Sequence, residues 1–170
     1  MRAVRVLLPL VLIVSGAVAP SAFAKADQRG WPKVPVTTPQ FFKSYDVRGI
    51  FHPGSAKSDK LLGFHGNDTL VGGPASDVLW GDWQPNNPTT QRDHLDGGPG
   101  RDFIYSSRGG GVLLGGPGND FIKAREGRGS IDCGPGRDIV KQSRLRRKNW
   151  KINKNCEKIS YTLDKHQNRK

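Results

Sequence analysis

The sequence is poor in the motifs that mark catalytic sites. Its four histidines, His52, His65, His94 and His166, show no HExxH or comparable metal-ligand spacing. No GxSxG nucleophile elbow occurs. Outside the glycine-rich repeats described below, the remaining segments are too short for a catalytic domain of ordinary size. We therefore expect a protein that is not an enzyme.

Long apolar runs are scarce as well, and the clearest one lies at the N-terminus. Arg2 and Arg5 give a positively charged start. Residues 6–14 are apolar, and Ala22-Phe23-Ala24 is a small-x-small cleavage site. This order is typical of a secretory signal peptide, residues 1–24. The run is shorter than the about 18 residues of a membrane-spanning helix, which favours a cleaved leader over a membrane anchor. We expect a secreted, extracellular mature chain of residues 25–170.

Cysteine is limited to Cys133 and Cys156. In an oxidising compartment an even count favours one disulfide, which would close a loop of about 24 residues and contribute about 3 kcal/mol. Two free buried thiols are the alternative.

Charge is also unevenly placed along the chain. Residues 63–136 hold six basic and nine acidic residues, whereas residues 137–170 hold twelve basic and three acidic ones. This pattern indicates cation binding in the centre and polyanion contact outside it.

Glycine, in contrast, is abundant and recurs with a period of nine residues. Units start at residues 63, 72, 97, 106, 115, 124 and 133, and their eighth position is always aliphatic. A further unit starts at 54, and another starts at 81 and carries seven extra residues within the stretch 83–92. The period therefore covers residues 54–141, and such a fixed period is the signature of a solenoid.

The composition of each unit predicts its local structure. Six residues rich in Gly, Pro, Asn and Asp form a turn, because glycine permits positive φ and close backbone approach. The last three residues are too few for a helix and are predicted to be a short strand with one inward side chain. Stacked units of this kind give an all-β, parallel β-solenoid with one row of aliphatic core residues.

Two units, at 97–105 and 115–123, match the pattern G-G-x-G-x-D-x-U-x at every defined position. The chain resembles the repeats-in-toxin (hemolysin-type) family of calcium-binding nonapeptide repeats. The resemblance implies a parallel β-roll with two nonapeptides per turn and Ca²⁺ between stacked turns on each edge. If alternate units share an edge, the sixth positions on one edge are Asp59, Asp77, Asp102, Asp120 and Asp138. Those on the other edge are Asp68, Asp93, Gly111 and Gly129.

This division predicts calcium sites chiefly along one edge. Calcium takes six to eight oxygen ligands, which Asp carboxylates and the carbonyls of glycine-rich turns supply. The best sites are expected between successive Asp residues of the complete row, and Asp59 is expected to contribute less because its unit has a single glycine. The alternative is that these Asp residues only cap turns by accepting backbone amides. The candidate calcium ligands are Asp77, Asp102, Asp120, Asp138, Asp68, Asp93, Gly98, Gly100, Gly116 and Gly118.

Both ends of the solenoid are expected to be capped. Residues 25–53 would form an N-terminal lead-in and cap, and residues 142–170 a basic C-terminal cap tied down by the disulfide. The basic segment between the cysteines is a candidate polyanion-binding patch, with Trp150 able to stack or anchor, although it could equally be a solvated loop. Its partners would include an anionic cell-surface polymer. The residues of this patch are Arg144, Arg146, Arg147, Lys148, Trp150 and Lys151.

The prediction is therefore a secreted, non-enzymatic calcium-binding β-roll in which calcium orders the fold outside the cell. In the alternative, calcium only stabilises a scaffold and the basic C-terminal segment acts in adhesion or polyanion binding.

Overall fold

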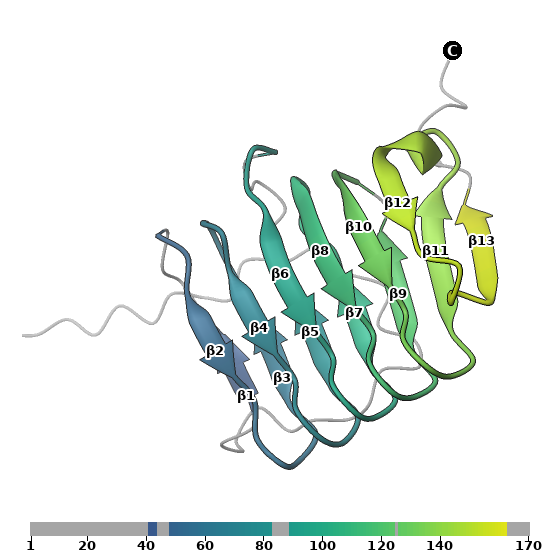
Figure 1. Ribbon diagram of the computed structural model, residues 1–170. Coiled ribbons are helices and arrows are strands. Elements are labelled where there is room, and N and C mark those ends of the chain that lie inside the picture. Colours follow the sequence, from purple (N-terminus) through teal and green to yellow (C-terminus); the bar gives the residue numbers. More distant parts are fainter. Residues whose placement is uncertain (1–40, 44–47, 83–88, 125, 163–170) are drawn as a thin grey trace, which may run out of the picture.

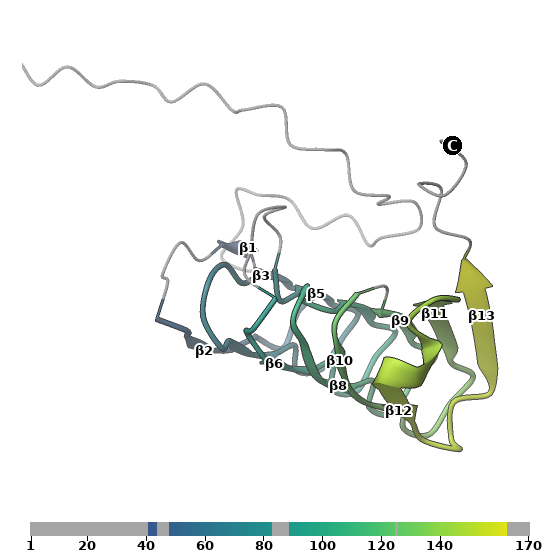
Figure 2. The same ribbon diagram turned by 90° about the horizontal axis from the view of Figure 1, so that it is seen from above.

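A computed structural model of the chain describes residues 41–43, 48–82, 89–124 and 126–162. The predicted signal peptide, much of the predicted N-terminal lead-in and His166 lie outside these ranges. Within them the chain winds as a parallel β-roll of two facing sheets, which confirms the predicted fold class (Figure 1). Seen from above, the two sheets lie as two layers, and their strands follow one another from β1 and β2 at the left to β13 at the right (Figure 2). None of the helices described is long and apolar enough to cross a membrane.

The odd-numbered strands form one sheet and the even-numbered strands form the other, and every pairing is parallel. The first sheet contains β1 (Phe41–Lys43), β3 (Lys60–Leu62), β5 (Val78–Trp80), β7 (Phe103–Tyr105), β9 (Phe121–Ala124), β11 (Ile139–Ser143) and β13 (Lys158–Thr162). The second contains β2 (Phe51–Pro53), β4 (Thr69–Val71), β6 (Asp93–Asp96), β8 (Gly110–Leu114), β10 (Arg128–Asp132) and β12 (Trp150–Ile152).

The core consists of the aliphatic residues predicted at the eighth position of each unit. They form two facing rows, one from each sheet. In the first sheet Leu61 pairs with Leu79, and the row continues in register through every odd strand to β13. Burying one aliphatic side chain contributes about 1.5–3 kcal/mol, so the stacked rows are the main source of cohesion. The fully buried members of the two rows are Leu61, Leu70, Leu79, Leu95, Ile104, Leu113, Ile122, Ile131 and Val140.

A second apolar cluster was not anticipated from the period. Val78, Phe103 and Tyr105 are buried at the seventh and ninth positions of their units, with Trp80 and Phe121 packed against them. Cations border this cluster, and their head groups lie over its rings at 5.3, 5.1 and 5.1 Å from the centroids. The cations are Arg101, Lys123 and Lys141. The β5–β7–β9 side of the first sheet is therefore apolar on its outer face as well as its inner one.

The chain continues the roll past the last nonapeptide. A 3₁₀ helix, η1 (Arg147–Asn149), leads into β12, which pairs with β10, and β13 then pairs with β11. Trp150 is 5% exposed and packs in the core at this end. At the other end Ile50 packs against the core, whereas Phe51, one of the residues expected in the N-terminal cap, is 69% exposed.

Candidate metal sites along one edge of the roll

The turns between the sheets fall into two sets, one along each edge. Turns that lead from even into odd strands lie side by side along the lower side of Figure 1. We call this side the aspartate edge, and it consists of residues 54–59, 72–77, 97–102, 115–120 and 133–138. The turns into even strands form the opposite edge, whose described residues are 63–68, 81–82, 89–93, 106–111, 124 and 126–129. Alternate units thus share an edge, as the two-per-turn arrangement requires.

Each aspartate of the aspartate edge is buried, with 0–2% of its surface exposed. The Oδ1 atoms form a ladder in which each carboxylate accepts the backbone N–H of the preceding aspartate. The N···O distance is 2.7 Å from Asp77 to Asp102, 2.9 Å from Asp102 to Asp120 and 2.8 Å from Asp120 to Asp138. The Asp59 amide donates to Asp77 in the same way at 2.6 Å. One oxygen of each carboxylate therefore does cap a turn.

The second oxygen has a different environment. Within the described residues, the Oδ2 atoms of Asp77, Asp102, Asp120 and Asp138 are buried and accept no hydrogen bond. A buried, unsatisfied carboxylate oxygen costs several kcal/mol of desolvation unless a donor or a cation compensates it. Turn capping alone therefore leaves the second oxygen of each carboxylate without a compensating partner. A hard cation between the rungs would supply one.

The local sequence makes room for these oxygens. A Cβ placed on Gly72, Gly97 or Gly115, the first residue of the unit, would lie 2.5–2.6 Å from Oδ2 of the Asp in the same unit. A side chain at these three glycines would displace the carboxylate, whereas the last unit carries Cys133 at position one. Gly98 and Gly116, at position two, have φ of +86° and +96°, the left-handed region that glycine tolerates.

Backbone carbonyls supply oxygen atoms between the turns. A Cβ on Gly116 would clash with the carbonyl oxygen of Gly98, and a Cβ on Gly118 with that of Gly100, so these carbonyls point from one turn toward the next. Among the described residues, no three His, Cys, Asp or Glu side chains gather as a metal-binding group. A cation at this edge would thus need both carboxylate and carbonyl oxygens, which is the mixed donor set that calcium accepts.

The first rung on each edge differs from the others. Asp68 accepts the amides of Ile50 and Phe64 at 3.0 and 3.1 Å, one on each oxygen. Asp59 is bonded likewise, because Ser55 donates its amide to one oxygen and its hydroxyl to the other. Asp93 accepts the Asp68 amide at 2.9 Å and keeps a buried, unbonded Oδ2, but the next sixth positions on its edge are glycines. On the opposite edge, Asp93 therefore has one buried oxygen without a hydrogen bond, and the carboxylate stacked on it is that of Asp68, whose two oxygens both accept amides.

Burial also changes the acidity of these carboxyls. Desolvation raises the pKa of Asp77 and Asp120 to about 7 and that of Asp102 to about 8. The neighbouring carboxylates of the ladder add to this rise, and the amide bonds oppose it. Desolvation likewise raises the pKa of Asp93 to about 7. Without a cation the charged form of the row is therefore disfavoured near neutral pH.

Without calcium, the roll is expected to lose stability as the pH rises from about 4 to about 8. The pKa values of Asp77, Asp102 and Asp120 in the folded state lie above the unfolded value of 3.8, so in this range the folded state holds more protons. Calcium binds the ionised carboxylates, so its affinity should rise over the same range. Thermal unfolding with and without a chelator would test this, and a calcium-free midpoint that increases with pH would contradict it.

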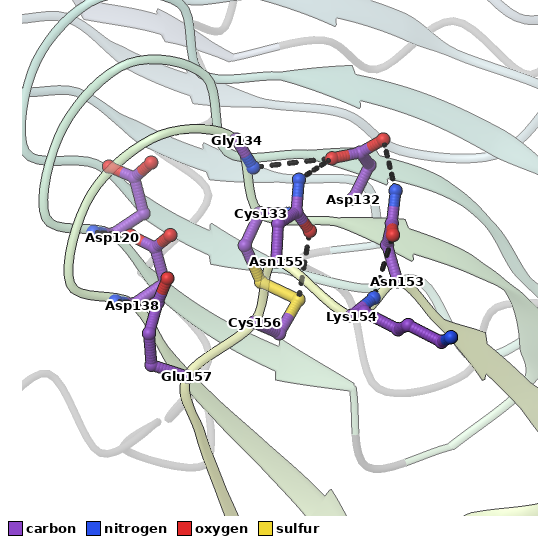
Figure 3. Close-up of a disulfide and its surroundings, with 10 residues drawn as sticks. All are labelled: Asp120, Asp132, Cys133, Gly134, Asp138, Asn153, Lys154, Asn155, Cys156 and Glu157. Carbon is purple, nitrogen blue, oxygen red and sulfur yellow. Dashed lines mark hydrogen bonds between the residues drawn. A yellow bond between two sulfur atoms is a disulfide. The ribbon is translucent and has the colours of Figure 1, made fainter.

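The ladder ends on a residue that sequence reasoning missed. The amide of Asp138 donates to Oε2 of Glu157 at 2.8 Å, just as the amide of Asp120 donates to Oδ1 of Asp138 at 2.8 Å (Figure 3). The charge of Glu157 also adds to the desolvation that raises the pKa of Asp138. Glu157 lies 19 residues after Asp138 and directly after Cys156, so it departs by one residue from the 18-residue spacing of two units. That near match was the available signal.

Glu157→Ala is expected to lower the free energy of unfolding by about 1–3 kcal/mol, because the buried amide of Asp138 would lose its acceptor. Glu157→Gln keeps a carbonyl oxygen at the same position and is expected to cost less. Urea unfolding at saturating calcium would measure both. Equal losses in the two variants would mean that the charge of Glu157, and not its hydrogen bond, is what stabilises the last rung.

The segment that carries Glu157 is fixed to the last repeat by covalent and polar contacts. Cys133 and Cys156 form the predicted disulfide, with Cα atoms 5.2 Å apart. Asp132 accepts the side-chain amides of Asn155 at 2.6 Å and Asn153 at 2.9 Å (Figure 3). These two bonds lower the pKa of Asp132. The final turn is thus held in place against the aspartate edge.

The basic segment lies at the far end of the opposite edge. Its charged residues, Arg144, Arg146, Arg147, Lys148 and Lys151, are all exposed. Trp150 is buried, and its Nε1 donates to the carbonyl oxygen of Glu126 at 3.2 Å. The predicted role of Trp150 in contacting a polyanion does not fit this position, because its ring packs in the core and is not offered to a partner.

Comparison with known proteins agrees with this geometry. The family model of the RTX calcium-binding nonapeptide repeat, four copies long, matches residues 54–84, 89–113 and 109–140. No curated protein and no solved structure matches the chain. The matched residues include the turns of both edges and the whole series from Asp59 to Asp138. RTX nonapeptide repeats bind Ca²⁺. The repeat region, residues 54–140, therefore belongs to the family of RTX calcium-binding nonapeptide repeats.

Proposed function

We propose that the mature chain is a secreted protein that binds a row of Ca²⁺ ions along its aspartate edge and depends on them for a stable fold. The observation that carries this proposal is the row of buried Oδ2 atoms without hydrogen-bond donors, at Asp77, Asp102, Asp120 and Asp138. The ladder of amide bonds already occupies the Oδ1 atoms and so fixes the direction of each carboxylate. The row is therefore preorganised for a cation.

The residues that would hold calcium come from successive turns. The pairs are Asp77 with Asp102, Asp102 with Asp120, and Asp120 with Asp138, each together with turn carbonyls such as those of Gly98, Gly100, Gly116 and Gly118. When bound, calcium supplies the positive charge that keeps these buried carboxylates ionised. Asp93 is a minor candidate, and Asp68 is less suited because both of its oxygens accept amides.

Secretion would link this chemistry to folding. Extracellular calcium modules bind at about 10⁻⁴–10⁻³ M, far above cytosolic calcium. A chain with such sites would keep its carboxylate row uncompensated inside the cell and complete the fold after export. The predicted leader, residues 1–24, fits this order of events, and the disulfide favours the same oxidising compartment.

Calcium titration of residues 25–170 tests the proposal. Circular dichroism is expected to show a gain of β structure at millimolar calcium, and calorimetry a matching heat of binding. Mg²⁺ at equal concentration is the control, because it demands octahedral geometry and retains its water. The absence of binding and of any structural gain at several millimolar calcium would overturn the proposal. N-terminal sequencing of exported protein tests secretion separately, with Lys25 expected as the first residue.

A further inference from the structure

The opposite edge changes its chemistry where its aspartates stop. After Asp93, the sixth positions of its turns are Gly111 and Gly129, so no carboxylate continues the row. On these turns and the loop beyond them, basic residues appear instead. They are Arg108, Arg128 and Arg146, from three different turns that the fold brings to one place. Beyond Asp93, the opposite edge therefore carries basic side chains and lacks the carboxylates that could bind a cation.

These arginines line a cleft of about 350 Å³. The cleft spans several rungs of the roll, and its walls combine guanidinium groups with a carboxylate, an amide, a hydroxyl and the backbone of two glycines. Its lining residues are Thr89, Arg108, Gly109, Glu126, Gly127, Arg128, Arg146 and Asn149. None of these lining residues is aromatic, and none has a purely hydrocarbon side chain.

The cleft has positive charge that the protein does not neutralise. Arg108 pairs with Glu126 at 3.2 Å, with the two side chains 42% and 51% exposed. Arg128 and Arg146 are exposed, and neither has an acidic partner within the part of the chain that the structure describes. Two guanidinium groups are therefore available. Their planar, forked donors suit carboxylate, phosphate or sulfate oxygens.

The rim of the cleft is held in shape by the C-terminal segment. The side-chain amide of Asn149 donates to the carbonyl oxygen of Gly127 at 3.3 Å, and Trp150 donates to that of Glu126 at 3.2 Å. These bonds fix η1 beside the turn 124–129. The exposed Arg144, Arg147 and Lys148 then extend the positive surface beyond the cleft.

We propose that this cleft binds the anionic groups of an acidic polysaccharide. Extended chains with repeated charges fit a groove that continues into a basic loop, and Thr89 and Asn149 add neutral hydrogen-bonding groups for hydroxyls. Single-stranded nucleic acid would need aromatic stacking surfaces, which this lining lacks and which Trp150 cannot provide while buried. A membrane surface would need several exposed apolar side chains beside the basic ones; the cleft has none among its lining residues, and the adjoining loop 144–149 offers Leu145 alone, which is 61% exposed.

The test compares matched charge changes on the two edges. Arg128→Gln with Arg146→Gln removes two charges from the cleft, and Arg101→Gln with Arg137→Gln removes two exposed charges from the aspartate edge. Each mature, oxidised variant is titrated at saturating calcium with a heparin oligosaccharide or an oligogalacturonate, and with poly(glycerol phosphate), a polyanion that is not a polysaccharide, as the phosphate comparison. These probes separate sulfate, carboxylate and phosphate chemistry. Circular dichroism verifies the fold, and a DNA duplex and anionic vesicles serve as competing ligands.

The cleft variant is expected to bind at least one polysaccharide about tenfold more weakly than the unaltered chain, and the control variant less than about twofold. Glu126→Gln should strengthen binding, because it frees Arg108 from its ion pair. Equal losses in both double variants would reduce the effect to net charge and overturn the proposal. It would also be overturned by the absence of polysaccharide binding, or by tighter binding of DNA or vesicles through the same arginines.

Discussion

Replacing Asp102 and Asp120 together by asparagine is expected to raise the calcium concentration at half-saturation by more than about tenfold, equivalent to about 1.4 kcal/mol. Asparagine keeps the Oδ1 acceptor that caps the preceding turn, so the amide ladder survives. It removes the charge and the buried second oxygen, which are the features that require a cation. Because each aspartate faces a neighbour on both sides, the double change affects every site between Asp77 and Asp138.

Asp68→Asn is the matched control, since both oxygens of Asp68 accept backbone amides. This variant should lose some stability through a lost acceptor but should keep its calcium midpoint. Calorimetric titration and circular dichroism at fixed pH measure both quantities. If Asp68→Asn moved the midpoint as far as the double variant does, calcium would not be concentrated at the aspartate edge.

Removing the disulfide through Cys133→Ser and Cys156→Ser is expected to lower the free energy of unfolding by about 3 kcal/mol. The bond joins residues 23 apart in sequence, and it closes a loop that contains η1 and β12. Serine is close to cysteine in size, so the lost constraint and the burial of two hydroxyls account for the change. Guanidinium unfolding at saturating calcium measures it.

The loss should be local before it is global. Hydrogen exchange is expected to accelerate most in β12 and β13 and least in β3 and β5. The pairs β10–β12 and β11–β13 each join a strand inside the disulfide loop to a strand outside it. A uniform acceleration along the roll would show that the disulfide acts only on the unfolded chain. A change well under 1 kcal/mol would mean that the contacts of Asn153 and Asn155 hold the final turn unaided.

The repeat region was predictable because each rung uses the same local chemistry. Glycine at position one leaves space for the carboxylate, and the aliphatic eighth position forms the core, so the nine-residue period carries both fold and ligand pattern. The division into two edges was implied by the resemblance to the repeats-in-toxin family, and the period then assigned each unit to its edge. The turn-capping interpretation and the metal interpretation were set against each other, but each carboxylate has one oxygen suited to each role.

Features that depend on departures from the period were not predictable. Glu157 falls one residue out of phase, because the last turn is reached through a disulfide-linked segment. The outer cluster of Phe103 and Tyr105 uses positions that the repeat leaves undefined. The cleft is lined by Arg108, Arg128 and Arg146, which come from separate turns. Its shape depends on how these turns pack against one another, which the repeat pattern does not specify.

The amide ladder of the aspartate edge gives the roll a polarity. Every aspartate amide finds its acceptor in the turn that follows it along the chain, from Asp59 through to Asp138 and finally Glu157. A chain cut after any of these turns would therefore leave one aspartate amide without its acceptor. The segment bearing Glu157 supplies the acceptor of the last one, so the ladder is complete only when this segment is in place.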